Sequence, residues 1–77
     1  MNKKDIKYLV EAEHIFYLDW VYAQLMDGEE ESKIKLVRWL VVHDICIELG
    51  LREKLTLKLY EGETKQDYKE RYKEYMK

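Results

Sequence analysis

Hydrophobic residues gather most densely in one stretch of the chain, residues 36–51, which reads LVRWLVVHDICIELGL. Flanking segments are more polar, and Gly50 stands where a left-handed residue commonly ends a helix. Several β-branched residues weaken the helical prediction, but end signals on both sides favour it. The pattern therefore predicts a helix over about residues 32–49, buried at the centre of the molecule with the other helices around it.

The segment of about residues 5–26 is predicted to be the first long helix, with Asn2 or Asp5 as its N-cap. At 100° per residue, its apolar side chains fall on two opposite faces instead of one. The first face holds Ile6, Leu9, Val10, Phe16, Tyr17, Trp20 and Ala23, and the second holds Tyr8, Ile15, Leu18, Tyr22, Leu25 and Met26. A surface helix normally has one apolar stripe. This helix is therefore expected either to be central or to present one face to another chain.

Each apolar face of the first helix also carries one carboxylate, Glu13 on the first and Glu11 on the second. A buried carboxylate needs a bonding partner. We expect each of these side chains to lie at the rim of its face or to pair with a basic residue.

The clearest turn signal is Asp27-Gly28, followed by three glutamates and Ser32. Ser32 is predicted to cap the second helix, and the acids just before or within its first turn suit the helix dipole. Such a short connection predicts that the two long helices are antiparallel.

After Gly50 the pattern is ambiguous. It is read as a short helix over about residues 52–61, and the alternative is an α+β fold with a hairpin made from 45–49 and 55–60. A C-terminal helix over about 64–76 has a capping-box signature at Thr64 and Asp67. The predicted class is therefore a small all-α bundle.

Composition agrees with a helical protein, because the chain of 77 residues contains no proline and three glycines. We expect a single domain over 1–77. The net charge is −2, with the excess of acids in residues 1–50, which argues against a nucleic-acid binder of strong basic character. One cysteine, no signal-peptide pattern and no apolar run of membrane-spanning length favour a cytoplasmic protein without membrane association.

Few residues suggest chemistry. His14, His43 and Cys46 are the only soft metal ligands, too few for a zinc site, and Cys46 is expected to be a small core residue. The carboxylate pairs 44/48 and 70/74 are expected to be solvated acids. We therefore expect no metal, no cofactor, no small-molecule substrate and no enzymatic activity.

The favoured function is a protein-interaction or regulatory module, which includes the role of an inhibitor. It would self-associate, foremost as a dimer, or dock on a larger partner through an aromatic face of the first helix. The predicted contact residues are Tyr8, Ile15, Phe16, Leu18, Trp20, Tyr22 and Leu25.

The alternative function is a helix-turn-helix DNA-binding regulator formed by residues 44–62. Leu49-Gly50-Leu51 matches the turn of that motif, and Arg52, Lys54 and Lys58 would face DNA. Thr56 departs from the motif because an apolar residue is expected there.

Overall fold

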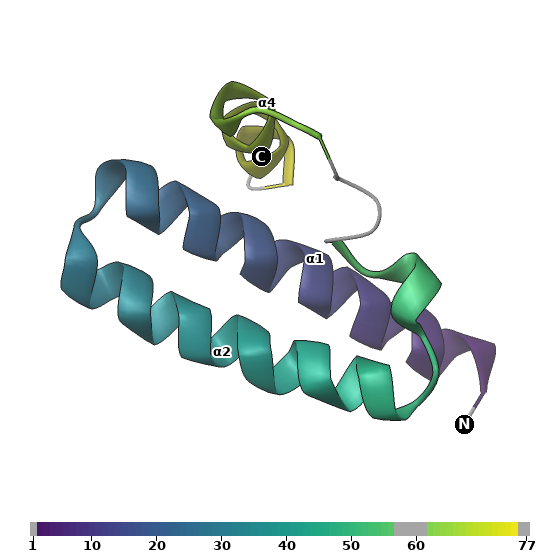
Figure 1. The fold of residues 1–77 in the computed structure, drawn as a ribbon. Helices are drawn as coiled ribbons and strands as arrows, with labels where there is room; N and C mark the ends of the chain where they lie inside the picture. Colours follow the sequence, from purple (N-terminus) through teal and green to yellow (C-terminus); the bar gives the residue numbers. More distant parts are fainter. Residues whose placement is uncertain (1, 57–61, 76–77) are drawn as a thin grey trace.

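The structure is a computed structural model that describes residues 2–56 and 62–75. Its elements are α1 (Lys3–Met26), α2 (Glu29–Glu48), the 3₁₀ helix η1 (Arg52–Lys54) and α4 (Lys65–Tyr75). Figure 1 shows α1 and α2 side by side and antiparallel, with α4 on the other side of α1. The described residues contain no strand, so the all-α prediction is confirmed.

The start of α1 follows the sequence prediction, because the side chain of Asn2 accepts a hydrogen bond from the backbone N–H of Asp5 at 2.9 Å. The start of α2 does not. Gly28 is the N-cap, with φ 91° and ψ −178°, and the three glutamates form the first turn. Ser32 therefore lies inside the helix, where its hydroxyl donates to the carbonyl of Glu29. The glutamates stabilise the helix N-terminus electrostatically, which lets α2 begin four residues earlier than a cap at Ser32 predicts.

The end of α2 is a Schellman motif. Leu51 N–H donates to the carbonyl of Cys46, and Gly50 N–H donates to the carbonyl of Ile47, both at 3.0 Å. Gly50 has a φ of 76°, as this motif requires. Because 45–48 is helical, the hairpin alternative is excluded.

The predicted short helix over 52–61 begins differently from expectation. Residues 52–54 form the single 3₁₀ turn η1, and Leu55 has an extended backbone with φ −89° and ψ 159°. Leu51 and Leu55, which flank this turn, are both buried in the core, and Thr56 is again helical. Residues 57–61 lie outside the described part of the chain.

The capping box of α4 is confirmed. Thr64 N–H donates to Asp67 Oδ2 at 2.8 Å, and Asp67 N–H donates to Thr64 Oγ1 at 3.3 Å. These hydrogen bonds from Thr64 lower the pKa of Asp67 below its ordinary value. Arg71 donates to the Glu63 carboxylate from Nε and Nη2, which form one edge of its guanidinium, with Nη2 at 2.7 Å from Oε1. This ion pair ties α4 to the chain just before it.

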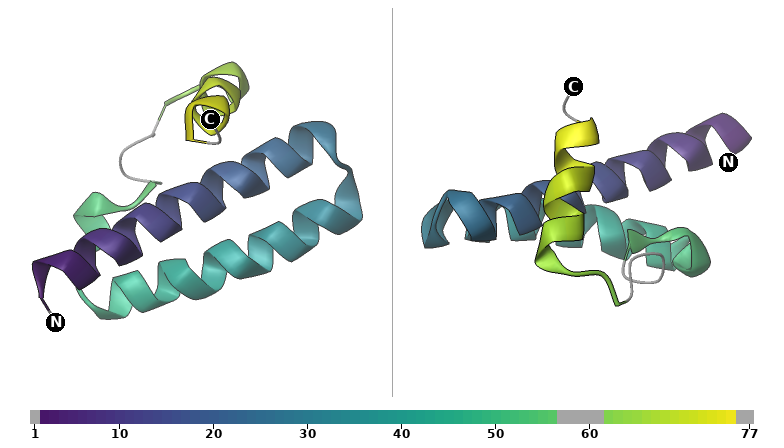
Figure 2. Two further views of the ribbon diagram at one scale, coloured as in Figure 1. Left: turned by 180° about the vertical axis from the view of Figure 1, so that it is seen from behind. Right: turned by 90° about the horizontal axis from the view of Figure 1, so that it is seen from above.

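The core consists of two apolar clusters along the α1–α2 pair. One contains Tyr17, Leu18, Val21 and Trp39, with Tyr68 and Tyr72 of α4 packed against it. The other contains Cys46, Leu51 and Leu55. Figure 2 shows α4 crossing α1 on the side away from α2. The central helix is therefore α1, whereas the sequence pattern pointed to 36–51, because α2 and α4 both pack on α1. Together they cover parts of both of its apolar faces, and Tyr8, Ile15 and Met26 of the second face stay exposed.

Candidate functional site

Between the two apolar clusters lies a buried polar centre built around Glu13. This side chain is 0% exposed, whereas the sequence predicted that it would lie at the rim of its apolar face or pair with a basic residue. Glu11, by contrast, is exposed and lies 3.9 Å from Lys7 as an ion pair one turn apart. The prediction for Glu11 is therefore confirmed. Glu13 is instead fully buried.

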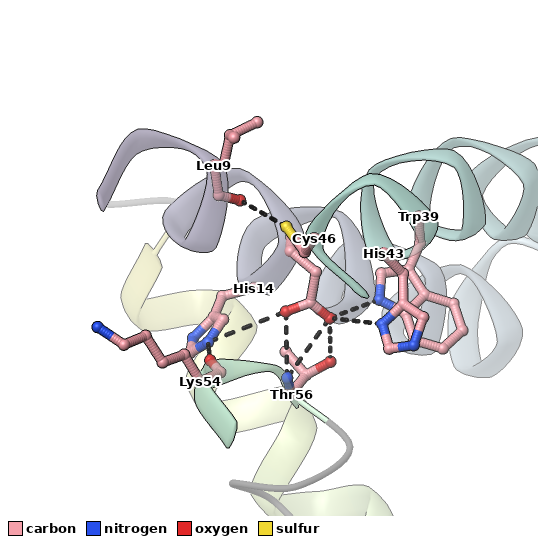
Figure 3. A network of polar contacts seen from close by, with 8 residues as sticks. Leu9, His14, Trp39, His43, Cys46, Lys54 and Thr56 are labelled. Carbon is pink, nitrogen blue, oxygen red and sulfur yellow. Dashed lines mark hydrogen bonds and ion pairs between the residues drawn. The ribbon is translucent and has the colours of Figure 1, made fainter. Parts of the chain in front are cut away.

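Three hydrogen-bond donors meet the Glu13 carboxylate. Trp39 Nε1 of α2 donates to Oε1 at 2.7 Å, and Thr56 donates both its backbone N–H, at 3.1 Å from Oε2, and its hydroxyl. Trp39 and Thr56 are labelled in Figure 3, where dashed lines show their bonds converging. Such bonds compensate the cost of removing a carboxylate from water.

Two histidines complete the surroundings of Glu13. His14 Nε2 lies 2.9 Å from the carbonyl of Lys54, so this nitrogen must carry a hydrogen. The same nitrogen is 3.9 Å from Glu13 Oε2, which is a longer, electrostatic contact. His43 Nδ1 is 3.6 Å from Glu13 Oε1, and its ring lies against Trp39 with centroids 5.0 Å apart. Within the described residues, this Nδ1 is a buried polar atom without a hydrogen-bond partner.

A carboxylate with two histidines is a combination found in catalytic sites, but in this protein the carboxylate is fully buried. The carboxylate is enclosed, so a substrate can reach it only if the helices separate. In the described part of the chain, no group of three or more His, Cys, Asp or Glu side chains is arranged to hold a metal ion. What the arrangement does is join three segments: α1 through Glu13, α2 through Trp39, and the chain beyond η1 through Thr56.

Cys46 lies beside this centre as a core residue. It is 0% exposed, and its Sγ is 3.8 Å from the carbonyl of Leu9. Burial, and secondarily the charge of Glu13, raise the pKa of its thiol above the ordinary value. The thiol is therefore held in its neutral, weakly reactive form.

Several of the α1 residues predicted to bind a partner pack against other parts of the same chain. Leu18 is 1% exposed. Trp20 stacks on Trp39 with centroids 5.3 Å apart, and Tyr22 stacks on Tyr72 of α4 at 4.1 Å. A side chain as buried as Leu18 offers no surface to another protein, so its assignment as a contact is corrected. Trp20 and Tyr22 pack on aromatic residues of α2 and α4.

The remaining predicted contacts are at the edge or on the surface of α1. Phe16 lies beneath the guanidinium of Arg38 at 4.7 Å, and Leu25 packs at the border of the first cluster. Tyr8 is 72% exposed and Ile15 is 37% exposed. Sequence periodicity identified these two correctly as side chains on the second face, but they lie two turns apart.

The residues proposed for DNA contact do not lie on an α-helix in the described part of the chain. Arg52 and Lys54 are exposed on the 3₁₀ turn, not on a recognition helix, and Lys58 lies outside the described residues. Arg52 and Lys54 therefore lack the helical frame that places side chains in a major groove.

A larger apolar surface lies on α2, on the side that faces away from α1. We call it the outer face of α2, and it consists of Ile34, Val37, Leu40, Val41, Ile45 and Ile47, all exposed between 39% and 61%. At 3.6 residues per turn they fall within an arc of about 160°. The buried residues Trp39 and Cys46 lie on the opposite side of the helix.

The sequence contained the signal for this surface. Residues 36–51 carry apolar side chains around most of the helix circumference, with few polar members, and a helix of this kind is normally buried on more than one side. In this chain α1 covers one side only. Sequence reasoning missed the outer face because it assumed that the most apolar helix was the one best covered.

Comparison of the chain with protein-family models, with curated proteins and with solved structures gave no significant match.

Among the described helices, none combines the length and the hydrophobicity needed to cross a lipid bilayer.

Proposed function

We propose that this protein is a non-enzymatic interaction module that binds another protein through the outer face of α2. The observation that carries the proposal is the concentration of six large exposed apolar side chains on that one helix face. Monomeric proteins rarely expose apolar patches of this extent without a function for them.

The architecture supports this role. Glu13, Trp39 and Thr56 fix α2 against α1 on its inner side, so the outer side is held in one orientation without contributing to the fold. A helix fixed in this way presents a preformed surface, and little conformational entropy is lost when a partner binds.

The test compares substitutions on two exposed surfaces. Val37→Asp with Val41→Asp places charges on the outer face, and Ile15→Asp with Tyr8→Asp is the matched control on α1. All four residues are exposed, so both variants should keep the helical circular dichroism of the parent. We expect affinity capture from the source cells to retain a protein partner with the parent and the α1 variant, and to lose it with the α2 variant.

Two other results of this capture experiment would contradict the proposed binding surface. If only the α1 variant loses the partner, the binding surface is that of Tyr8 and Ile15. If both variants retain it equally, the outer face of α2 is not the binding surface and the proposal is wrong.

The alternative function, DNA binding, is tested by a separate experiment. Replacing Arg52 and Lys54 by glutamate would then abolish a gel shift with duplex DNA at low salt, where phosphate contacts are strongest. We expect the parent protein to shift no duplex under those conditions.

A further inference from the structure

The outer face of α2 carries an ordered pattern of charge in addition to its apolar residues. One straight stripe runs through Glu30, Ile34, Val37, Val41, Asp44 and Glu48, with alternating spacings of four and three residues. This is the spacing with which one helix packs along another. The stripe is apolar in its middle and acidic at both ends.

The basic residues of α2 do not neutralise these acids. Lys35 forms an ion pair with Asp19 of α1 at 2.9 Å, Lys33 pairs with Glu29 at 3.3 Å, and Arg38 lies over Phe16. All three cations are thus occupied. In the described part of the chain, the carboxylates of Glu30, Asp44 and Glu48 take part in no hydrogen bond or ion pair.

Resting on the function proposed above, we infer that the partner is an amphipathic helix with lysine or arginine at both ends of its apolar stripe. Leu or Ile side chains in the middle of that helix would pack on Val37 and Val41. Its cations would meet Glu30 at one end and Asp44 and Glu48 at the other. A carboxylate that loses water at an interface needs such a cation, because an unpaired charge is destabilised when it is desolvated.

A second copy of this chain fits the stripe poorly. In a parallel pair, each acid of the stripe meets its own counterpart. In the antiparallel pair that sets Val37 against Val41, Glu30 of one copy meets Glu48 of the other. Either arrangement opposes like charges, which destabilises association. The pattern therefore favours a different protein over a homodimer, which the sequence analysis had predicted to form through the first helix.

The test uses three synthetic peptides of 20 residues, the length of α2. All share an apolar stripe, and lysine, glutamine or glutamate occupies both ends of it. Binding is measured by fluorescence anisotropy at about 0.01 M and about 0.15 M salt, because screening weakens charge contacts. We expect the lysine peptide to bind at least about tenfold more tightly than the glutamate peptide, with glutamine between them.

Paired charge reversals locate the effect. Asp44→Lys with Glu48→Lys changes the stripe, whereas Glu70→Lys with Glu74→Lys makes the same change of charge at the same spacing on the exposed surface of α4. Lysine near the C-terminus of α2 suits the helix dipole, so the first variant should stay folded. We expect it to lose at least about tenfold in affinity for the lysine peptide and to gain affinity for the glutamate peptide, while the α4 variant changes by less than about threefold.

The outcomes separate this inference from the proposed function. If Val37→Asp with Val41→Asp abolishes peptide binding but the reversal at Asp44 and Glu48 has no effect, the outer face binds proteins and the inference of a cationic partner is wrong. If the Val37 and Val41 variant binds the lysine peptide as the parent does, both proposals are wrong. If light scattering shows a dimer of the parent that the Val37 and Val41 variant dissolves, the occupant is a second copy and the inference is overturned.

Discussion

At the scale of single residues, Glu13 is the side chain on which most of the described polar interactions of the core converge. Its carboxylate accepts hydrogen bonds from Trp39 and from Thr56, and the imidazole of His43 lies 3.6 Å away. The donor groups of Trp39 and Thr56 are buried from water together with the carboxylate. Removing the carboxylate therefore leaves several buried polar groups without a partner, which costs more than the bonds themselves contribute.

We predict that Glu13→Ala lowers the free energy of unfolding by about 3 kcal/mol or more, which is a large part of the stability of a domain of this size. Glu13→Gln preserves the volume but turns an N–H toward the donors, so it should cost about 1–3 kcal/mol. Urea unfolding followed by circular dichroism measures both. Glu11→Ala is the control, because its exposed pair with Lys7 should contribute less than about 1 kcal/mol. Equal stability of the Glu13 and Glu11 variants would show that the polar centre is dispensable.

Single residues also show what could be predicted from the sequence. The caps at Asn2, Gly50 and Thr64 were identified because their chemistry is local and acts within a few residues. The full burial of Glu13 and its hydrogen-bond donors were not predicted, because those donors lie 26 and 43 residues away. No local pattern distinguishes a carboxylate at the rim of an apolar face from one that meets buried donors.

At the scale of elements, α4 is attached to α1 largely by aromatic contacts. Tyr68 packs edge-to-face on Tyr17 at 5.5 Å, and Tyr72 stacks on Tyr22 at 4.1 Å. Burial and the hydrogen bond with Tyr68 raise the pKa of Tyr17 well above its usual range. Burial also raises the pKa of Tyr72, together with the neighbouring carboxylate of Asp19. The other described side chains of α4 are charged or polar, so these two tyrosines carry most of the docking.

We predict that Tyr72→Ala loosens α4 while α1 and α2 stay paired. Trypsin should then cleave after Lys69, Arg71 and Lys73 at least about fivefold faster than in the parent, which corresponds to the roughly 1 kcal/mol contributed by an aromatic pair. Mass spectrometry of the digest should show an intact fragment that spans α1 and α2. Glu74→Ala serves as the control on the exposed side of the same helix. Cleavage that accelerates equally throughout the chain would mean that α4 is required for the whole fold.

The elements also explain why the binding surface was first assigned to α1. Both α1 and α2 carry apolar residues around most of their circumference, and each was recognised as a helix. Which of two such helices becomes central depends on where α4 packs. That choice is decided by Tyr68 and Tyr72 meeting Tyr17 and Tyr22, contacts of 50 residues or more in separation, and not by the periodicity of either long helix.

At the scale of the whole molecule, the inner and outer sides of α2 have separate roles. The inner side contributes Trp39 and Cys46 to the two clusters of the core. The outer side contributes to neither. Substitutions that abolish binding can therefore leave the fold intact, which is the property that makes the variants at Val37 and Val41 informative.

The bonds to Glu13 have one more consequence, for the way in which the chain folds. A hairpin of α1 and α2 alone would bring Trp39 to the carboxylate but not Thr56, so two of the three donors would be missing. Such an intermediate is disfavoured, and α1, α2 and the chain as far as Thr56 should unfold in one all-or-none transition. The backbone amide of Thr56, although it follows a 3₁₀ turn, should then exchange with deuterium as slowly as the amide of Leu18 in the middle of α1, because both open only when this unit unfolds.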